Sequence, residues 1–209
     1  MNLFSPTTIT AAFAVIVVIS NAISAKLIAL PFFTDFAIPA GMITYPFTFL
    51  LSDLMTELYG EKEGRTMVWT ALLLSLLSVV IIETAIHLPS SDPALQKAFK
   101  SVLGLNGWAV IASLTAYTLS QTLDVKLYAW IRSLTGDKML WLRNNGSTLV
   151  SQIVDTITVN WIFLYWGIGL EPAAIFQVML FSYFYKASFS IFTTPFYYLL
   201  VQHASKRLV

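Results

Sequence analysis

The sequence has no cysteine and only two histidines in its 209 residues. Without cysteine there is no disulfide framework, thiolate metal site or cysteine nucleophile, and two histidines alone argue against a zinc enzyme. Charged residues are scarce too, at 11% of the chain, against roughly 25% in a typical soluble domain. The 12 basic and 11 acidic residues nearly cancel, so no positive field is available to hold a nucleic acid. These absences exclude a water-soluble domain and a nucleic-acid partner, and we expect neither a metal nor a cofactor.

Hydrophobic residues are abundant instead, at 57% of the chain. A membrane helix takes about 20 apolar residues, so a chain of this length accommodates about six spans and no separate soluble domain. We therefore predict an all-α membrane protein, a single domain over residues 1–209 with six transmembrane helices. The predicted spans cover approximately residues 9–30, 43–59, 67–86, 108–131, 147–168 and 173–201.

One long loop, residues 87–107, separates the third and fourth spans. Within it, Asp92 followed by Pro93 is typical of a helix start. Apolar residues then recur at helical spacing from Leu95 to Leu103, which predicts a short amphipathic helix on the membrane surface.

Basic residues near the span ends indicate the orientation. The side of the long loop carries only Lys97 and Lys100 near the span ends, fewer basic residues than the opposite side. This difference predicts that both termini lie on that opposite, cytoplasmic side. That side carries Lys62, Arg65, Arg132, Lys138, Arg143, Lys206 and Arg207.

Five carboxylates fall within the predicted spans: Asp53, Glu57, Glu83, Asp124 and Asp155. Each costs about 2.5 to 3.5 kcal/mol on insertion scales, so we expect them to face a cavity or a partner. Asp53 and Glu57 are four residues apart and share one helix face. Like charges at that spacing require cations, donors or a shared proton. Glu83 and Asp124 lie near span ends, where contact with lipid headgroups is the alternative.

Two lysines also lie within the spans. Lys186 is near the middle of the last span and does not easily reach water, which predicts an interior role. Lys26 is near the outer end of the first span, where a lysine side chain snorkels to the interface.

A short internal echo links the fourth and fifth spans. The pattern Ser-Gln-x-x-Asp at residues 120–124 recurs at residues 151–155, on helices that cross the bilayer in opposite directions. The echo is short, so both chance and an inverted repeat stay open. In either case the glutamine and the aspartate share one helix face and can donate to and accept from a polar ligand.

The link between these spans, residues 141–148, is the most polar segment at a predicted membrane edge. Its Asn, Gly, Ser and Thr residues favour a helix start, whose free N–H groups suit an anion or a carbonyl oxygen. The alternative is a plain helix cap with Arg143 held at the headgroups.

Several of these segments form an ordered set. They are Tyr45-Pro46-Phe47-Thr48-Phe49, Ser52-Asp53-Leu54-x-x-Glu57-x-Tyr59-Gly60, Leu123-Asp124-Val125, Arg143-Asn144-Asn145-Gly146-Ser147-Thr148-Leu149 with Asp155-Thr156, and Phe184-x-Lys186. In this order and spacing they resemble the queuosine precursor transporter family, also called vitamin uptake transporters. The resemblance implies a multi-pass protein of the bacterial inner membrane that takes up 7-deazaguanine bases for tRNA modification. It also implies a hydropathy similar to that of the six-helix substrate-binding subunits of energy-coupling-factor transporters.

The implied ligands are 7-cyano- or 7-aminomethyl-7-deazaguanine, or queuine, whose ring edge offers two adjacent donors and the acceptor O6. The two ring donors would be accepted by the carboxylate of Asp155 or Glu57. The acceptor O6 would receive a hydrogen bond from Gln152, Asn145 or Lys186. An aromatic side chain would stack on the flat ring. The predicted substrate-binding residues are Tyr45, Phe47, Asp53, Glu57, Gln121, Asn145, Gln152, Asp155 and Lys186.

Two other functions stay open. One is a membrane-embedded enzyme of the aspartyl hydrolase type, although the sequence has no histidine within a span and no G-x-S-x-G motif to support it. The other is a binding subunit for another vitamin-like solute. The energy source is also open. Proton exchange at Asp53, Glu57 or Asp155, an ATP-driven energy-coupling module and facilitated diffusion are the alternatives. Whether the protein forms a homodimer is open as well.

Overall fold

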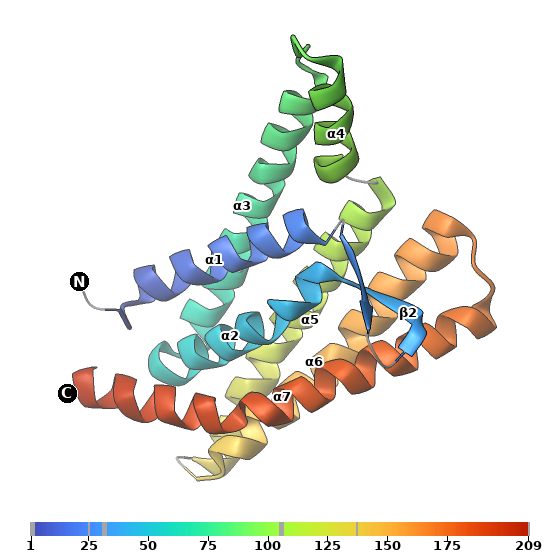
Figure 1. The fold of residues 1–209 in the computed structure, drawn as a ribbon. Helices are drawn as coiled ribbons and strands as arrows, with labels where there is room; N and C mark the ends of the chain where they lie inside the picture. Colours follow the sequence, from blue (N-terminus) through green and yellow to red (C-terminus); the bar gives the residue numbers. More distant parts are fainter. Residues whose placement is uncertain (1–2, 25, 31–32, 105–106, 137, 209) are drawn as a thin grey trace.

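Long helices make up most of the structure, a computed structural model that describes residues 3–24, 26–30, 33–104, 107–136 and 138–208 (Figure 1). A 3-10 turn, η1 (Ala40–Ile43), precedes α2, and a π-helix, η2 (Trp161–Ile168), continues α6. The α-helices are α1 (Pro6–Ile23), α2 (Tyr45–Tyr59), α3 (Glu61–His87), α4 (Pro93–Leu103), α5 (Gly107–Thr135), α6 (Leu140–Asn160) and α7 (Pro172–Leu208).

A small antiparallel sheet follows α1 and corrects the first predicted span. The helix ends at Ile23 rather than near residue 30, and Leu27–Leu30 forms strand β1, which pairs with β2 (Phe33–Pro39). A short apolar run does not distinguish the end of a helix from a strand. Here the backbone groups of the run are satisfied across the sheet. Lys26, between α1 and β1, is exposed.

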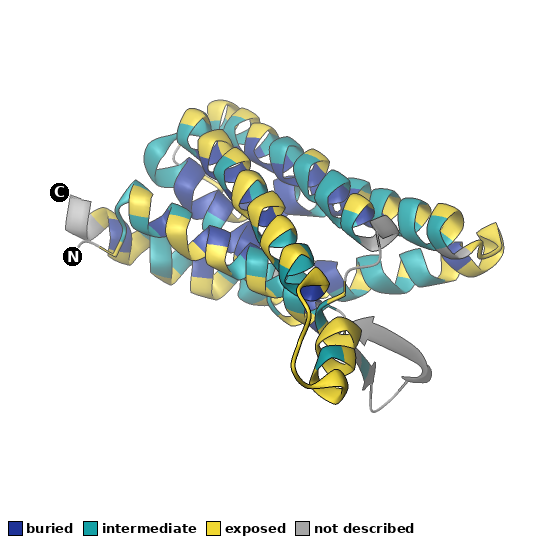
Figure 2. Cartoon of the chain, turned by 90° about the horizontal axis from the view of Figure 1, so that it is seen from above, coloured by how far each residue is buried: buried dark blue, intermediate teal, exposed yellow. Residues whose placement is uncertain are grey.

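The helix predicted in the long loop is confirmed as α4. The side chain of Asp92 accepts hydrogen bonds from the N–H groups of Ala94 and Leu95, and Pro93 is the first helical residue. No residue of α4 is buried, and the helix projects from the bundle beside the end of α3 (Figure 2).

Helix α6 corrects a second prediction. Residues 141–148 were expected to form a polar link and a helix start with free N–H groups, but α6 already begins at Leu140. The backbone N–H groups of residues 144–148 therefore lie inside the helix and bond to its own carbonyls. The polar side chains of this segment contact neighbouring helices instead of capping the helix, as described below.

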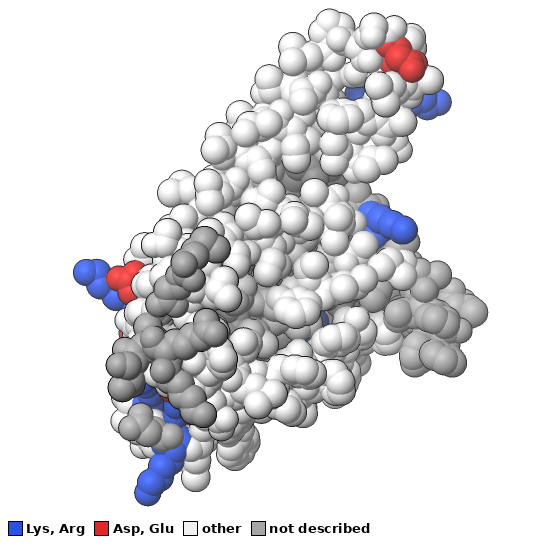
Figure 3. Space-filling model, turned by 60° about the vertical axis from the view of Figure 1, so that its left-hand side comes forward, with Lys and Arg blue, Asp and Glu red and all other residues white. Residues whose placement is uncertain are grey.

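The outside of the bundle is apolar, and its interior holds polar and charged side chains beside an apolar core that includes Phe13, Leu54 and Met67. Large apolar side chains on α3 and α7 face outward, such as Leu73 at 64% and Phe192 at 70% exposure. The face in Figure 3 is almost free of charge, with its few charged residues near the margins. Within the described part of the chain, three helices are long and apolar enough to cross a membrane: α1, α3 and residues Pro172–Ser205 of α7. This architecture is that of a multi-pass membrane protein.

The two ends of the chain lie together. The ring of Phe4, just before α1, is 5.8 Å from the ring of His203 near the end of α7, and the Tyr59 hydroxyl donates to the Phe4 carbonyl at 2.6 Å. The start of α1, the α2–α3 turn and the end of α7 therefore share one end of the bundle (Figure 1).

Candidate substrate-binding site

Helix α6 has a buried face made only of polar residues. This face packs against α5 and α7 and lies beside α2, so each polar side chain needs a partner inside the bundle or a ligand. The buried residues of α6 are Arg143, Asn144, Asn145, Ser147, Thr148, Ser151, Gln152, Asp155 and Thr156.

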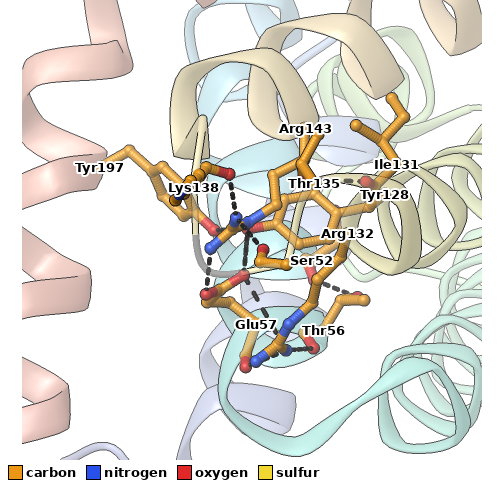
Figure 4. Close-up of polar contacts among 11 residues, drawn as sticks. Ser52, Thr56, Glu57, Tyr128, Ile131, Arg132, Thr135, Lys138, Arg143 and Tyr197 are labelled. Atoms are coloured by element: carbon orange, nitrogen blue, oxygen red, sulfur yellow. Dashed lines mark hydrogen bonds and ion pairs between the residues drawn. The ribbon is translucent and has the colours of Figure 1, made fainter.

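At one end of this face, Arg143 binds the carboxylate of Glu57 from α2 with two hydrogen bonds. Nη2 donates to Oε1 at 2.6 Å and Nε donates to Oε2 at 2.9 Å, and both side chains are over nine-tenths buried. The remaining guanidinium nitrogen, Nη1, donates to the carbonyls of Gly136 and Lys138. Arg143 is therefore not held at the headgroups, and it ties α2 to the α5–α6 connection (Figure 4).

Two tyrosines extend this network toward α7. The Tyr128 hydroxyl of α5 donates to Glu57 Oε2 at 2.7 Å and is also hydrogen-bonded to the Tyr197 hydroxyl of α7. Arg132 of α5 donates to the Glu57 carbonyl at 2.5 Å. Glu57 thus joins α2, α5 and α6 directly, and α7 through Tyr128 (Figure 4).

One helical turn before Glu57, Asp53 is fully buried and lies opposite Asp124 of α5. Ser52, the residue before Asp53, donates to Asp124 Oδ2 at 3.3 Å, so the two carboxyl groups lie close together. Asn144 of α6 donates to Oδ2 of Asp53, whereas Oδ1 has no partner among the described residues. Asp124 also has 0% exposure, so the alternative that places it at the headgroups is wrong.

The echoed segments of α5 and α6 contact each other reciprocally. Ser151 of the second donates to Asp124 of the first at 2.9 Å, and Ser120 of the first donates to Asp155 of the second at 3.3 Å. The two segments are therefore structurally equivalent across a local pseudo-two-fold axis between the helices.

Asp155 differs from Asp124 because it forms an ion pair with a lysine. Lys186 Nζ of α7 lies 2.6 Å from Asp155 Oδ2, and both side chains are buried. The interior role predicted for Lys186 is to neutralise a carboxylate from α6 and to join α6 to α7.

A small cavity lies between α2, α6 and α7, with a volume of about 10 Å³, enough for about one water molecule. Three α6 side chains that follow one another along the helix face contribute to it, namely Asn144, Thr148 and Gln152. Thr148 Oγ1 and Gln152 Oε1 are buried acceptors without a hydrogen-bond partner among the described residues. The remaining lining residues are Pro46, Phe49, Leu50, Ser190, Thr193 and Tyr197.

The other predicted site residues are dispersed. Asn145 is bound to Thr194 of α7 at 2.8 Å and to the Trp141 carbonyl, so it joins α6 to α7. Gln121 is buried on α5, and its Oε1 has no partner among the described residues. Phe47 is 53% exposed and is not among the cavity residues. The side chain of Tyr45 lies outside the described part of the structure.

Several residues of the site were missed by the sequence analysis, above all Asn144, Thr148 and Tyr128. A signal for the first two was present: polar residues recur along residues 143–156 at spacings of three and four, which is the period of one helix face. Tyr128 gave no such signal, because a tyrosine is equally common in apolar packing. Among the described residues, no group of three or more His, Asp or Glu could hold a metal ion.

The apolar exterior, the apolar helices and the buried polar network around a small cavity are those of a multi-pass membrane protein. Comparison with known proteins gives the family. A family model described as "Putative vitamin uptake transporter" matches residues 39–200, and the chain belongs to this family. The protein is accordingly a transporter and not an enzyme.

Three relatives are similar to the chain over most of its length. A probable queuosine precursor transporter of Bacillus subtilis is 32% identical over 81% of this chain and 72% of the relative. The queuosine precursor transporter of Escherichia coli is 27% identical over 80% and 75%. A probable queuosine precursor transporter of Haemophilus influenzae is 29% identical over 73% and 61%. No solved structure matches the chain significantly.

Proposed function

We propose that this transporter imports queuosine precursors or related 7-deazaguanine bases across a bacterial inner membrane for tRNA modification. The observation that carries the proposal is the polar face of α6, with unpartnered acceptors on Thr148 and Gln152 beside a cavity. The names of the three relatives support the choice of substrate. We take 7-cyano-7-deazaguanine, 7-aminomethyl-7-deazaguanine and queuine as the candidate bases.

In this proposal six helical segments cross the bilayer: α1, α2 with η1, α3, α5, α6 with η2, and α7. An even number of crossings agrees with the chain ends lying at one end of the bundle. The exposed Lys62 and Arg65 lie directly after the α2–α3 turn at that same end. Arg143 is occupied by Glu57, but the other basic residues counted in the sequence still outnumber those near α4, so the positive-inside rule supports cytoplasmic termini.

The base would bind where the cavity meets α6. Thr148 Oγ1 and Gln152 Oε1 are free to accept the N1–H and the exocyclic amine of a deazaguanine edge. The Asn144 amide, which also lines the cavity, is a donor suited to O6. Phe49 and Tyr197 contribute aromatic groups to the same cavity, and such rings favour stacking with a flat base.

A cavity of about 10 Å³ is too small for a purine-sized ring, so binding requires the cavity to open. Its walls come from α2, α6 and α7, and therefore α7 or α2 must move away from α6. The network at Glu57 and the ion pair of Lys186 lie on either side of the cavity along α6. We propose that these contacts keep the helices together while the cavity between them opens.

The test is uptake of radiolabelled 7-cyano-7-deazaguanine by cells that can neither make the base nor import it. Cells that express the protein should accumulate intact base and regain queuosine in their tRNA. Thr148→Val replaces the unpartnered hydroxyl with a methyl of similar size and should lower the apparent affinity about tenfold, the effect of losing one hydrogen bond to a buried polar group. Gln152→Leu should act in the same direction.

The matched control is Thr84→Val, which makes the same change at an exposed position of α3 and should leave uptake unchanged. Absence of uptake of all three bases by well-inserted protein would overturn the proposal. Uptake of a different vitamin-like solute in a competition panel would then identify the cargo.

A further inference from the structure

We propose that Asp53 and Asp124 share one exchangeable proton and form the proton-coupling site of the carrier. This inference rests on the proposed transport function and adds its energy source. It concerns a pair of residues on α2 and α5 that lies next to the cavity, behind Asn144.

The first argument is the balance of buried charge. Among the residues whose burial is described, four carboxyl groups lie in the interior, on Asp53, Glu57, Asp124 and Asp155. Glu57 is paired with Arg143 and Asp155 with Lys186. Neither Asp53 nor Asp124 takes part in an ion pair with the described side chains. Two adjacent carboxylates without a cation do not both stay ionised away from water, so this pair holds a proton.

The second argument is an unsatisfied atom. Asp53 has 0% exposure, and its Oδ1 has no hydrogen-bond partner among the described residues. Oδ2 of the same group accepts from Asn144, and Asp124 accepts from Ser151 and Ser52. The donors around the pair thus leave Oδ1 of Asp53 as an acceptor without a partner among the described residues. A single proton placed there converts mutual repulsion into a hydrogen bond.

The surrounding groups also favour protonation of this pair over its neighbours. The titratable and charged groups that face it are Glu57 on α2, Tyr128 on α5, Tyr197 on α7 and Arg143 on α6. The one cation among them is already bound by Glu57 through two hydrogen bonds. Of the residues that the sequence suggested for proton exchange, Glu57 and Asp155 are therefore matched by cations, and Asp53 is not.

The pseudo-symmetry of α5 and α6 makes the same point independently. Asp124 and Asp155 occupy equivalent positions and accept from equivalent serines. One of them faces an ammonium group and the other faces a second carboxyl group. The equivalent positions therefore have different charge states, one a fixed ion pair and one a site for a movable proton.

Asn144 provides the connection to the cargo, because it donates to Asp53 and also lines the cavity. When O6 of a bound base draws the amide away, Asp53 loses its donor and retains the shared proton more firmly. The proton and the neutral base then cross together. On the cytoplasmic side the O–H bond breaks, the proton passes to water, and Asn144 returns to Asp53 as the base leaves.

The experiment uses purified protein in liposomes, labelled 7-cyano-7-deazaguanine and a membrane potential clamped at zero with potassium and valinomycin. With one proton per neutral nucleobase, an acid-outside gradient of one pH unit supports about tenfold accumulation, because one pH unit is a tenfold difference in proton concentration and one proton moves with each nucleobase. Wild-type protein should reach this level and should show none without the gradient. Addition of the nucleobase 7-cyano-7-deazaguanine should also make the outside medium more alkaline, because protons enter the liposomes with it.

Asp53→Asn and Asp124→Asn should reduce the accumulation to about onefold. The control Glu83→Gln removes a partly exposed carboxylate from α3 and should accumulate like the wild type. Either aspartate variant could fold poorly. The proton flux measured with wild-type protein therefore tests proton coupling without any variant.

The outcomes separate this inference from the proposed function. Wild-type protein that exchanges labelled base but neither accumulates it under the gradient nor moves protons would overturn the proton site and leave the carrier function intact. Accumulation by both aspartate variants would overturn the site as well. Failure to exchange any of the three bases would overturn the proposed function, and the inference with it.

Discussion

Ser151 on α6 donates a 2.9 Å hydrogen bond to Asp124 on α5, and its counterpart Ser120 on α5 returns a 3.3 Å bond to Asp155 on α6. The shorter bond serves the carboxyl group that has no ion-pair partner among the described side chains. The two serines therefore occupy equivalent positions, but we expect them to contribute unequally to the stability of the protein.

This inequality gives the first prediction. Ser151→Ala removes a donor from a buried group and should lower the free energy of unfolding by about 1.5 to 3 kcal/mol, the range for hydrogen bonds to charged groups. Ser120→Ala should cost less, because Lys186 still satisfies Asp155. Melting of the purified proteins in detergent measures both, and equal losses would show that the two contacts are equivalent.

The Glu57–Arg143 pair should be a main determinant of stability. Glu57→Gln leaves the guanidinium of Arg143 buried without a carboxylate, which typically costs about 3 to 5 kcal/mol. Arg143→Met should cost less, because Arg132 Nη1 still lies 3.9 Å from Glu57 Oε2. Arg143→Lys should also be poorly tolerated, since an ammonium does not reproduce the two-bonded geometry. Thermal unfolding in detergent is the measurement.

An exposed pair offers the matched control. Arg65 and Glu61 on α3 are 3.7 Å apart and nearly half exposed, so Glu61→Gln should change stability by less than about 1 kcal/mol. A comparable loss at both pairs would contradict the assignment of Glu57 and Arg143 as the buried connection between α2 and α6.

For Asp155 and Lys186, removal of both charges should be better tolerated than removal of one. Lys186→Met leaves an isolated carboxylate within the bundle and should strongly reduce the yield of inserted protein, whereas the combination with Asp155→Asn should recover much of it. A double-mutant cycle of yield and melting temperature gives the coupling. Additive losses would mean that the two groups do not act as a pair.

Gly64 on α3 lies in close contact with α2 and α5. A Cβ atom there would lie 2.6 Å from Thr56 Oγ1 and 3.0 Å from a methyl of Val125, and both neighbours are fully packed. Gly64→Ala should destabilise the bundle by about 1 to 3 kcal/mol through overpacking. At Gly146 on α6 the nearest atom is the terminal methyl of Ile131, at 3.2 Å, so Gly146→Ala should be milder; the reverse order would contradict this packing.

The sequence predicted the parts of this protein that depend on composition and spacing. Apolar runs located the helices, and Asp92 with Pro93 located the start of α4. The cost of charge in a membrane correctly placed Asp53 and Lys186 inside. The similarity to energy-coupling-factor binding subunits stays a prediction.

Partner choice was not predictable, because it depends on which helices meet. The i, i+4 spacing of Asp53 and Glu57 indicated a shared face, but their separate partners, Asn144 and Arg143, come from a helix 86 residues or more along the chain. For Arg143, contact with the headgroups was one of two alternatives, because its polar neighbours are typical of a helix start at the membrane edge. Only the packed structure shows that this segment is helical and inward.

The polar face of α6 has a consequence for how the protein is made. A helix whose buried residues are Arg, Asn, Ser, Thr, Gln and Asp partitions poorly into lipid when it leaves the translocon alone. The reciprocal serines and aspartates of α5 and α6 cover much of that polarity as soon as the two helices meet. The pair should therefore enter the bilayer as a hairpin, and variants that weaken the α5–α6 contact should also lower the yield of inserted protein.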